Sequence, residues 1–148
     1  MFKHVLVPTD GSRTATRGAK AGIKLAAALG ARVTAVYVIA PYAPTLYGEG
    51  AIYFPPASPK DYRKASEQSA KKALAGIEIE AQTAGVGYAG LFITDPQPWG
   101  GILRTARAKK CDAIAMASHG RGGLAGLLLG SETQRVLAHS KIPVIVFR

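Results

Sequence analysis

The chain has 148 residues, which at about 100–200 residues per domain is the length of one domain, spanning 1–148. Hydrophobic residues make up 48% and charged residues 19%, which argues against wholesale disorder, and the single cysteine excludes an internal disulfide framework and a cysteine-based metal site. The 19 Lys and Arg against 9 Asp and Glu give a net charge of +10, but they are dispersed and not interleaved with aromatic residues, so we expect a solvated basic surface and no nucleic-acid face.

The N-terminal part of the chain is predicted to form a strand, a helix and a second strand. Residues 2–8 contain a continuous apolar run, which is typical of a strand buried on both faces. Ser12 is a good N-cap for a helix over 13–29, whose periodicity ends at Gly30. The β-branched residues over 31–40 predict the second strand, so this part of the chain indicates a βαβ unit.

The next segment, 41–59, differs in composition from the rest of the chain. It is rich in proline and tyrosine and carries one charged residue, Glu49. We predict an irregular loop, which is long for a compact domain. Two interpretations stay open: a lid or binding loop, and a loop packed by its own aromatic residues.

Helices and strands alternate through the rest of the chain. The expected elements are a helix over 60–84 entered through Ser58-Pro59, a strand over 86–93, a helix over 98–109, a strand over 112–117, a glycine-rich loop over 118–130, a helix over 131–140 and a strand over 142–147. This alternation predicts an α/β fold, a single-domain open five-stranded parallel sheet with helices on both faces.

The glycine-rich loop is the most informative segment of the sequence. It follows a strand, precedes a helix and places five glycines between 120 and 130, where the backbone can approach a ligand closely. Ser131 to Gln134 matches a capping box. The backbone amides of Ser131, Glu132 and Thr133 are therefore expected to form an anion site at a helix N-terminus.

A second loop is expected at the same edge of the sheet. Pro8, Thr9 and Asp10 follow the first strand, and the carboxyl ends of parallel strands meet at one edge, where ligands bind at the topological switch point. A phosphate site beside a carboxylate that could hold ribose hydroxyls indicates a nucleotide. Taken singly, Ser131 and Asp10 could each serve only as helix caps.

The chain resembles the universal stress protein family over nearly its whole length. The matching motifs lie at 5–12, 36–39, 118–124, 128–131 and 143–146. The ATP-binding branch of that family carries Gly-x2-Gly-x9-Gly-Ser/Thr, which Gly120 and Gly130-Ser131 fit. Ala117 stands at the first glycine position, and we expect its methyl group to narrow the pocket without abolishing it.

The resemblance implies a fold, a ligand and an assembly. The fold is adenine nucleotide alpha hydrolase-like, with strand order 3-2-1-4-5, and the ligand is ATP or AMP, with magnesium as an option. The residues implied in binding are Pro8, Thr9, Asp10, Val38, Met116, Ala117, His119, Gly120, Gly130, Ser131, Glu132 and Thr133. Family members usually form homodimers through the last strand, and a role in stress response or signalling would require a further protein partner.

Two other functions remain open at this point. A slow ATPase would need a general base, for which Asp10 is the candidate, although a ribose contact suits this residue better. A nucleotide-free scaffold protein is the other alternative, and Ala117 is the residue that hints at it.

Several further signals are set aside. Gly-x-Gly-x-x-Gly over 85–90 follows a helix, the wrong context for a dinucleotide fingerprint. The neighbouring side chains of Ser118 and His119 are expected to diverge, which disfavours a nucleophile–base pair. Cys111 is expected to be unreactive, and Trp99 to pack a helix. No apolar run reaches about 18 residues and residues 1–12 lack a secretory pattern, so we expect a cytoplasmic protein with no membrane partner.

Overall fold

The computed structural model describes residues 1–43, 58–119 and 129–148. Its elements are, in chain order, β1 (His4–Thr9), α1 (Arg13–Leu29), β2 (Arg32–Ile39), α2 (Pro59–Thr83), β3 (Tyr88–Thr94), α3 (Pro98–Ala108), β4 (Ala113–Ala117), α4 (Ser131–His139) and β5 (Val144–Phe147). The predicted alternation of helices and strands is confirmed. The segment 44–57, which holds most of the predicted long loop, lies outside the described residues, as does 120–128 in the glycine-rich loop.

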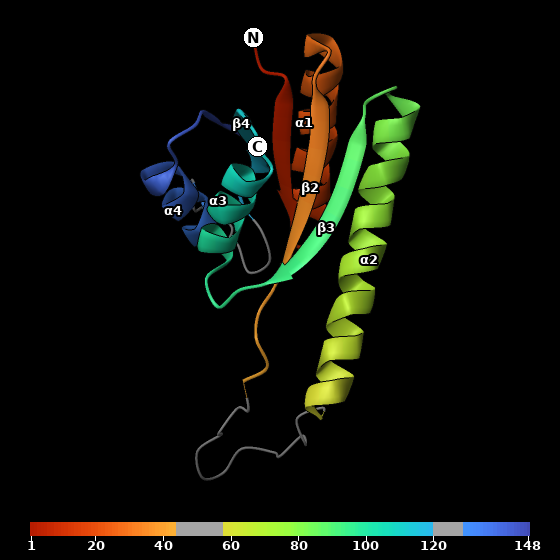
Figure 1. Ribbon diagram of the computed structural model, residues 1–148, viewed down its shortest axis with the longest axis vertical. Coiled ribbons are helices and arrows are strands. Elements are labelled where there is room, and N and C mark those ends of the chain that lie inside the picture. Colours follow the sequence, from red (N-terminus) through yellow and green to blue (C-terminus); the bar gives the residue numbers. More distant parts are fainter. Residues whose placement is uncertain (44–57, 120–128) are drawn as a thin grey trace.

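The strands form one five-stranded sheet in the order β3-β2-β1-β4-β5, and all pairings are parallel. Helices α1 and α2 cover one face, and α3 and α4 cover the other (Figure 1). The predicted fold class and strand order are therefore confirmed. Each crossover helix returns the chain to the same edge, so every strand ends at one side of the sheet.

Alternation along the central strand explains how both faces are buried. In β1, Val5 and Val7 pack with the side chains of α1 and α2, whereas Leu6 packs with those of α3 and α4. All three side chains are fully buried, and burial of such a side chain stabilises the fold by roughly 1.5–3 kcal/mol. This pattern accounts for the continuous apolar run in the sequence.

The helix caps follow the sequence in the first half of the chain. Ser12 Oγ accepts a hydrogen bond from the backbone N of Ala15 (3.1 Å), and Gly30 ends α1 in the left-handed region with φ 62°. Ser58 caps α2 by accepting from the backbone N of Asp61. These three predictions from capping preferences are confirmed.

Strands β3 and β5 each begin two residues later than the sequence predicts. The chain is still closing α2 at Val86, whose backbone N donates to Ala81, so β3 starts at Tyr88 and not at 86. Ser140 and Ile142 exchange hydrogen bonds in a turn, so β5 starts at Val144 and not at 142. The apolar residues Val86 and Ile142 lie in these turns, and their composition led to strand boundaries that are two residues too early.

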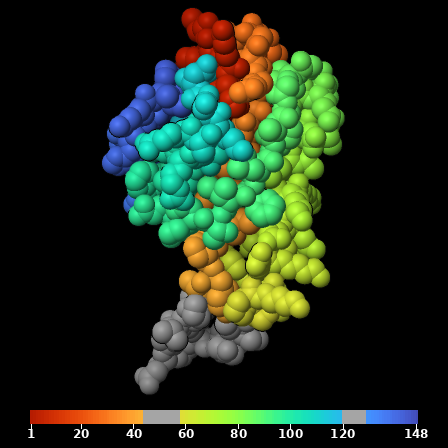
Figure 2. Space-filling model, in the orientation of Figure 1, coloured from red at the N-terminus to blue at the C-terminus, as the bar shows by residue number. Residues whose placement is uncertain are grey.

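Helix α2 is longer than its packing against the sheet requires. Its buried residues are confined to its second half, from Ala70 to Ala81. The first half extends past the ends of the strands (Figure 1), and in Figure 2 it lies beside the orange residues that follow β2. This part of α2 is therefore free to border a site at the carboxyl edge. No helix in the described ranges has the length and hydropathy needed to cross a membrane.

Candidate functional site

The central strands β1 and β4 separate before they end. Their pairing stops at Leu6 and Ile114, although β1 continues to Thr9 and β4 to Ala117. On its other side β1 remains paired with β2 up to Thr9 and Tyr37. The sheet therefore opens a crevice between β1 and β4, at the point where the strand order reverses.

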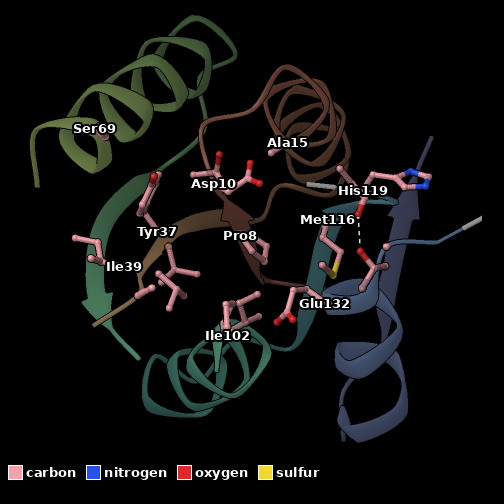
Figure 3. Close-up of a pocket in the computed structure, with 18 of the residues that line it drawn as sticks. Pro8, Asp10, Ala15, Tyr37, Ile39, Ser69, Ile102, Met116, His119 and Glu132 are labelled. Atoms are coloured by element: carbon pink, nitrogen blue, oxygen red, sulfur yellow. Dashed lines mark hydrogen bonds between the residues drawn. The ribbon is translucent and has the colours of Figure 1, made fainter. Parts of the chain in front are cut away.

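A cavity of about 760 Å³ occupies this crevice. Its walls come from the ends of β1, β2 and β4, the beginnings of α3 and α4, and the first half of α2 (Figure 3). This volume lies within the range of roughly 300–1,000 Å³ that small-molecule sites occupy. The structure brings every predicted site residue except Gly120 to the lining, and Gly120 lies outside the described residues.

The cavity also has walls that the sequence did not identify. The additional lining residues are Ala15, Val36, Tyr37, Ile39, Ala40, Tyr62, Ala65, Ser66, Ser69, Pro98 and Ile102. Tyr62, Ala65, Ser66 and Ser69 stand at i, i+3, i+4 and i+7, the spacing of one helix face. That spacing is visible in the sequence, but nothing in it distinguishes a cavity wall from an ordinary helix face.

A hydrogen bond holds this part of α2 against the end of β2. The hydroxyl of Tyr62 donates to the carbonyl of Ala40 at 2.7 Å, and its ring meets that of Tyr42 edge to face. The contact joins segments on either side of 44–57. It therefore fixes the distance between two walls of the cavity.

The β2 end of the cavity is mostly apolar. Val36, Val38, Ile39 and Ile102 line it. Pairing between β2 and β3 continues to Ile39, whereas β1 offers β2 no partner beyond Tyr37. The edge of β2 at Val38 therefore faces the cavity without a β1 residue beside it.

The beginning of α4 differs from the predicted capping box. Gly130 is the N-cap, with φ −69° and ψ 156°, Ser131 is already helical, and no side chain makes the cap bond. The reason is a long-range bond, because the amide of Gly130 donates to the carbonyl of Ser118 at 2.7 Å. The side chain of Gln134 donates to the carbonyl of Leu129 instead of closing a box.

The expected set of backbone donors is nevertheless present. The amides of Ser131, Glu132 and Thr133 are the first of α4, so the helix itself offers them no acceptor. Within the described ranges no side chain accepts a hydrogen bond from them either. Thr133 Oγ1 donates to the carbonyl of Ala117 (3.1 Å), shown as a dashed line in Figure 3. This bond fixes the start of α4 against the end of β4.

Asp10 lies on the opposite side of the cavity, at the end of β1 (Figure 3). Its Oδ1 accepts a hydrogen bond from the backbone N of Ser12 at 2.9 Å. Ser12, and not Asp10, caps α1, so the interpretation of Asp10 as the helix cap is wrong. The bond holds the turn that presents the carboxylate to the cavity.

Glu132 contributes a second carboxylate. Its Oε2 accepts a hydrogen bond from the backbone N of Trp99 at 2.8 Å, so a side chain of α4 satisfies an amide in the first turn of α3. The Trp99 ring stacks on His139 with 4.7 Å between ring centroids. Trp99 is thus a packing aromatic residue, as predicted.

Ser118 and His119 do not diverge as the sequence analysis expected. Ser118 Oγ and His119 Nδ1 lie 2.9 Å apart. However, Ser118 is only 3% exposed and does not line the cavity. The His119 ring points away from the middle of the cavity (Figure 3). The pair is therefore not placed to attack a bound substrate.

Cys111 and the glycine pattern over 85–90 have the environments that the sequence predicted. Burial raises the pKa of the Cys111 thiol to about 11, and Asp112 adds to that rise, so the thiol is protonated at neutral pH. Gly85 ends the turn after α2 and Gly90 lies inside β3, which is not a dinucleotide fingerprint. Across the described ranges no three metal-ligating side chains gather into a cluster.

The fold is shared with solved structures of related proteins. A universal stress protein in complex with cAMP superposes with a TM-score of 0.72 at 21% identity, covering 99% of this chain and 97% of that one. An Arabidopsis thaliana universal stress protein family member with AMP bound has a TM-score of 0.66 at 16% identity, covering 98% and 90%. A universal stress protein from Archaeoglobus fulgidus in complex with dAMP has a TM-score of 0.63 at 19% identity, covering 100% and 98%.

Sequence comparison gives the family. The chain is 32% identical over 149 residues to the universal stress protein in the QAH/OAS sulfhydrylase 3' region of Thermus aquaticus, with 100% of both chains covered. It is 30% identical over 150 residues to a universal stress protein of Methanocaldococcus jannaschii, covering 100% of this chain and 83% of that one. The model of the universal stress protein family matches residues 1–148. The chain therefore belongs to the universal stress protein family.

Proposed function

We propose that this chain binds an adenine nucleotide, ATP or AMP, in the cavity between β1 and β4. The observation that carries the proposal is the crevice itself, where the Asp10 carboxylate and the first amides of α4 line the same space. These are the partners that a ribose and a phosphate require. The cavity volume of about 760 Å³ accommodates such a ligand.

The base belongs at the β2 end of the cavity in this proposal. The apolar wall there excludes water from a planar ring, and backbone groups at Val38 can hydrogen-bond its edge. Backbone donors and acceptors at fixed positions distinguish one base from another.

The ribose and phosphate belong between Asp10 and α4. A carboxylate accepts hydrogen bonds from ribose hydroxyls, and helix N-terminal amides donate to phosphate oxygens. Met116, Ala117 and His119 line the wall between these two points. The two hydrogen bonds that join α4 to the end of β4 preorganise the amides, so little ordering is needed on binding.

The ligands of related proteins support the choice of adenine. The three solved relatives hold cAMP, AMP and dAMP. An adenine nucleoside with one phosphoryl group is common to all three. Magnesium enters the proposal only as a counter-ion for a longer phosphate chain, with oxygen ligands from phosphate and at most one or two carboxylates.

The proposal is one of binding rather than turnover. Asp10 and Glu132 are the carboxylates among the described lining residues, and each already accepts a hydrogen bond from a backbone amide. Neither is placed by an observed contact as a general base for water. The slow ATPase that the sequence left open as an alternative therefore has no further observation in its favour.

The decisive experiment identifies the ligand directly. Mass spectrometry of small molecules released on denaturation should detect an adenine nucleotide, and equilibrium dialysis with labelled AMP and ATP should give saturable binding. Ser131→Glu places a negative charge at the α4 amides and should abolish binding. Ser131→Ala is the matched control, because the amide and not the hydroxyl is the proposed donor.

The alternatives predict different results. A nucleotide-free scaffold releases no nucleotide and shows no binding below millimolar concentration. A Ser131→Glu variant that remains folded and binds as tightly as the wild type would contradict the proposed phosphate position.

A homodimer in a cytoplasmic stress or signalling pathway completes the proposal. Strand β5 lies at the edge of the sheet, where an unpaired backbone can add a strand from a second copy. Multi-angle light scattering should give twice the chain mass, and a mass of one chain would contradict the dimer. Signalling requires a protein partner, which the 41–59 segment or the dimer geometry would contact; residues 44–57 of that segment lie outside the described ranges.

A further inference from the structure

We propose that Glu132 is a specificity-determining residue that makes the cavity prefer a nucleoside monophosphate to a triphosphate. This inference rests on the proposed nucleotide site and concerns which ligand that site selects. It starts from a contrast between the whole chain and its cavity. The chain carries a net charge of +10, yet the lining residues that the structure describes include two carboxylates and neither lysine nor arginine.

The position of the Glu132 charge is fixed by its hydrogen bond. Oε2 accepts from the backbone N of Trp99 at 2.8 Å, in the first turn of α3. A carboxylate at a helix N-terminus is stabilised by the helix dipole and by the unsatisfied amide. The side chain is half-buried and lines the cavity, and Figure 3 shows its carboxylate directed toward α3. It is therefore held in place and does not extend into solvent.

The same residue supplies one of the amides proposed to bind phosphate, and its side chain lines the same cavity. Glu132 is the second residue of α4, so its backbone N–H is one of the proposed phosphate donors. Its carboxylate, in contrast, repels the negative charge of a bound phosphate. Each additional phosphoryl group brings further negative charge to this corner. Coulomb repulsion in a partly buried site is much stronger than in water. A monophosphate therefore suffers less repulsion than a triphosphate, unless a divalent cation offsets the extra charge.

The test compares two ligands and removes one charge. Isothermal titration calorimetry would measure the Kd of AMP and of ATP with EDTA present, for the wild type and for Glu132→Gln. Glutamine retains an oxygen that can accept from the Trp99 amide. We expect Glu132→Gln to tighten ATP binding on the order of tenfold and AMP binding by a clearly smaller factor.

Two control variants separate charge from structure. Glu78→Gln removes the same charge from α2, away from the cavity lining, and should leave both affinities unchanged. Glu132→Asp retains the charge but shortens the side chain that reaches Trp99. If Glu132 acts through charge, Glu132→Asp retains the preference for AMP and Glu132→Gln loses it. If Glu132 acts only as a cap, Glu132→Gln, which can keep the bond to the Trp99 amide, leaves the ratio of the two Kd values unchanged, and this result overturns the inference.

The outcomes distinguish this inference from the proposed function. If the wild type binds AMP but Glu132→Gln leaves the ratio of the Kd values for AMP and ATP unchanged, only the role of Glu132 is overturned. A wild type that binds neither nucleotide overturns the nucleotide site and this inference together. Thermal unfolding of each variant verifies that it is folded before its affinities are compared.

Discussion

The methyl group of Ala117 lies against Gly18 of α1. A Cβ built on Gly18 would stand 2.8 Å from the Ala117 Cβ and 2.7 Å from the Ala117 backbone N. Ala117 stands at the first glycine position of the motif that the family resemblance implies. Because Gly18 has no side chain, α1 provides the space that this methyl group occupies. The methyl group that alanine adds at position 117 is thus packed against α1, in addition to lining the cavity.

This contact predicts that Gly18→Ala destabilises the fold by about 1–3 kcal/mol, because the new methyl group overlaps β4. Adding Ala117→Gly should restore only part of the loss, since the clash with the backbone N remains. Chemical denaturation measures the free energy of unfolding. The control is Gly76→Ala in α2, where a Cβ meets nothing within 4 Å. The higher helix propensity of alanine should raise the free energy of unfolding of this variant by roughly 0.5–1 kcal/mol.

The bond from Thr133 to β4 gives a second prediction. Thr133→Val keeps the shape of this buried side chain but removes the donor to the Ala117 carbonyl. We expect a loss of about 1–3 kcal/mol in unfolding free energy. Thr133→Ser keeps the hydroxyl and should retain more of the stability. Equal stability of Thr133→Val and the wild type would show that the bond contributes nothing.

His4 predicts how stability depends on pH. Burial, and then Arg32, lower the pKa of His4 below its ordinary value of 6.5, and Asp112 opposes them only in part. The unfolded chain therefore takes up a proton at higher pH than the folded protein does. The contribution of neutral, buried His4 to the free energy of unfolding is therefore complete above pH 6.5 and is lost as the pH falls below that value.

Urea unfolding between about pH 8 and about pH 5 checks this dependence. His4→Gln removes the titration while retaining a partner for Thr34 Oγ1, which lies 2.7 Å from His4 Nε2. The variant should lose less stability on acidification than the wild type. Identical slopes for the two proteins would refute the assignment to His4. Asp112 does not interfere, because its pKa lies below 3.8, outside this range.

Cys111 predicts a chemical difference between the folded and unfolded chain. Burial raises the pKa of its thiol to about 11, and the thiolate is the reactive form. Labelling with Ellman's reagent at neutral pH should be slow in the native protein and fast in urea. Rapid labelling of the native protein would contradict the burial of this thiol.

Local patterns in the sequence were sufficient for the order of elements and for three helix caps. Ser12, Gly30 and Ser58 act within a few residues of their own position, so neighbouring sequence determines their roles. Parallel strands also bring their carboxyl ends to one edge whatever the details of packing. For that reason the loop after the first strand and the start of the last helix could be placed at one edge from their residues, whereas Val38, Met116, Ala117 and His119 were assigned through the family resemblance.

Contacts between distant segments had to come from the tertiary structure. The cap of α4 is Gly130 because its amide meets Ser118, 12 residues earlier, and Glu132 meets Trp99 across 33 residues. The first half of α2 becomes a cavity wall only because the helix extends past the sheet. Residue preferences describe a segment and its immediate neighbours; which polar groups meet depends on how far each strand and helix extends once the core is packed.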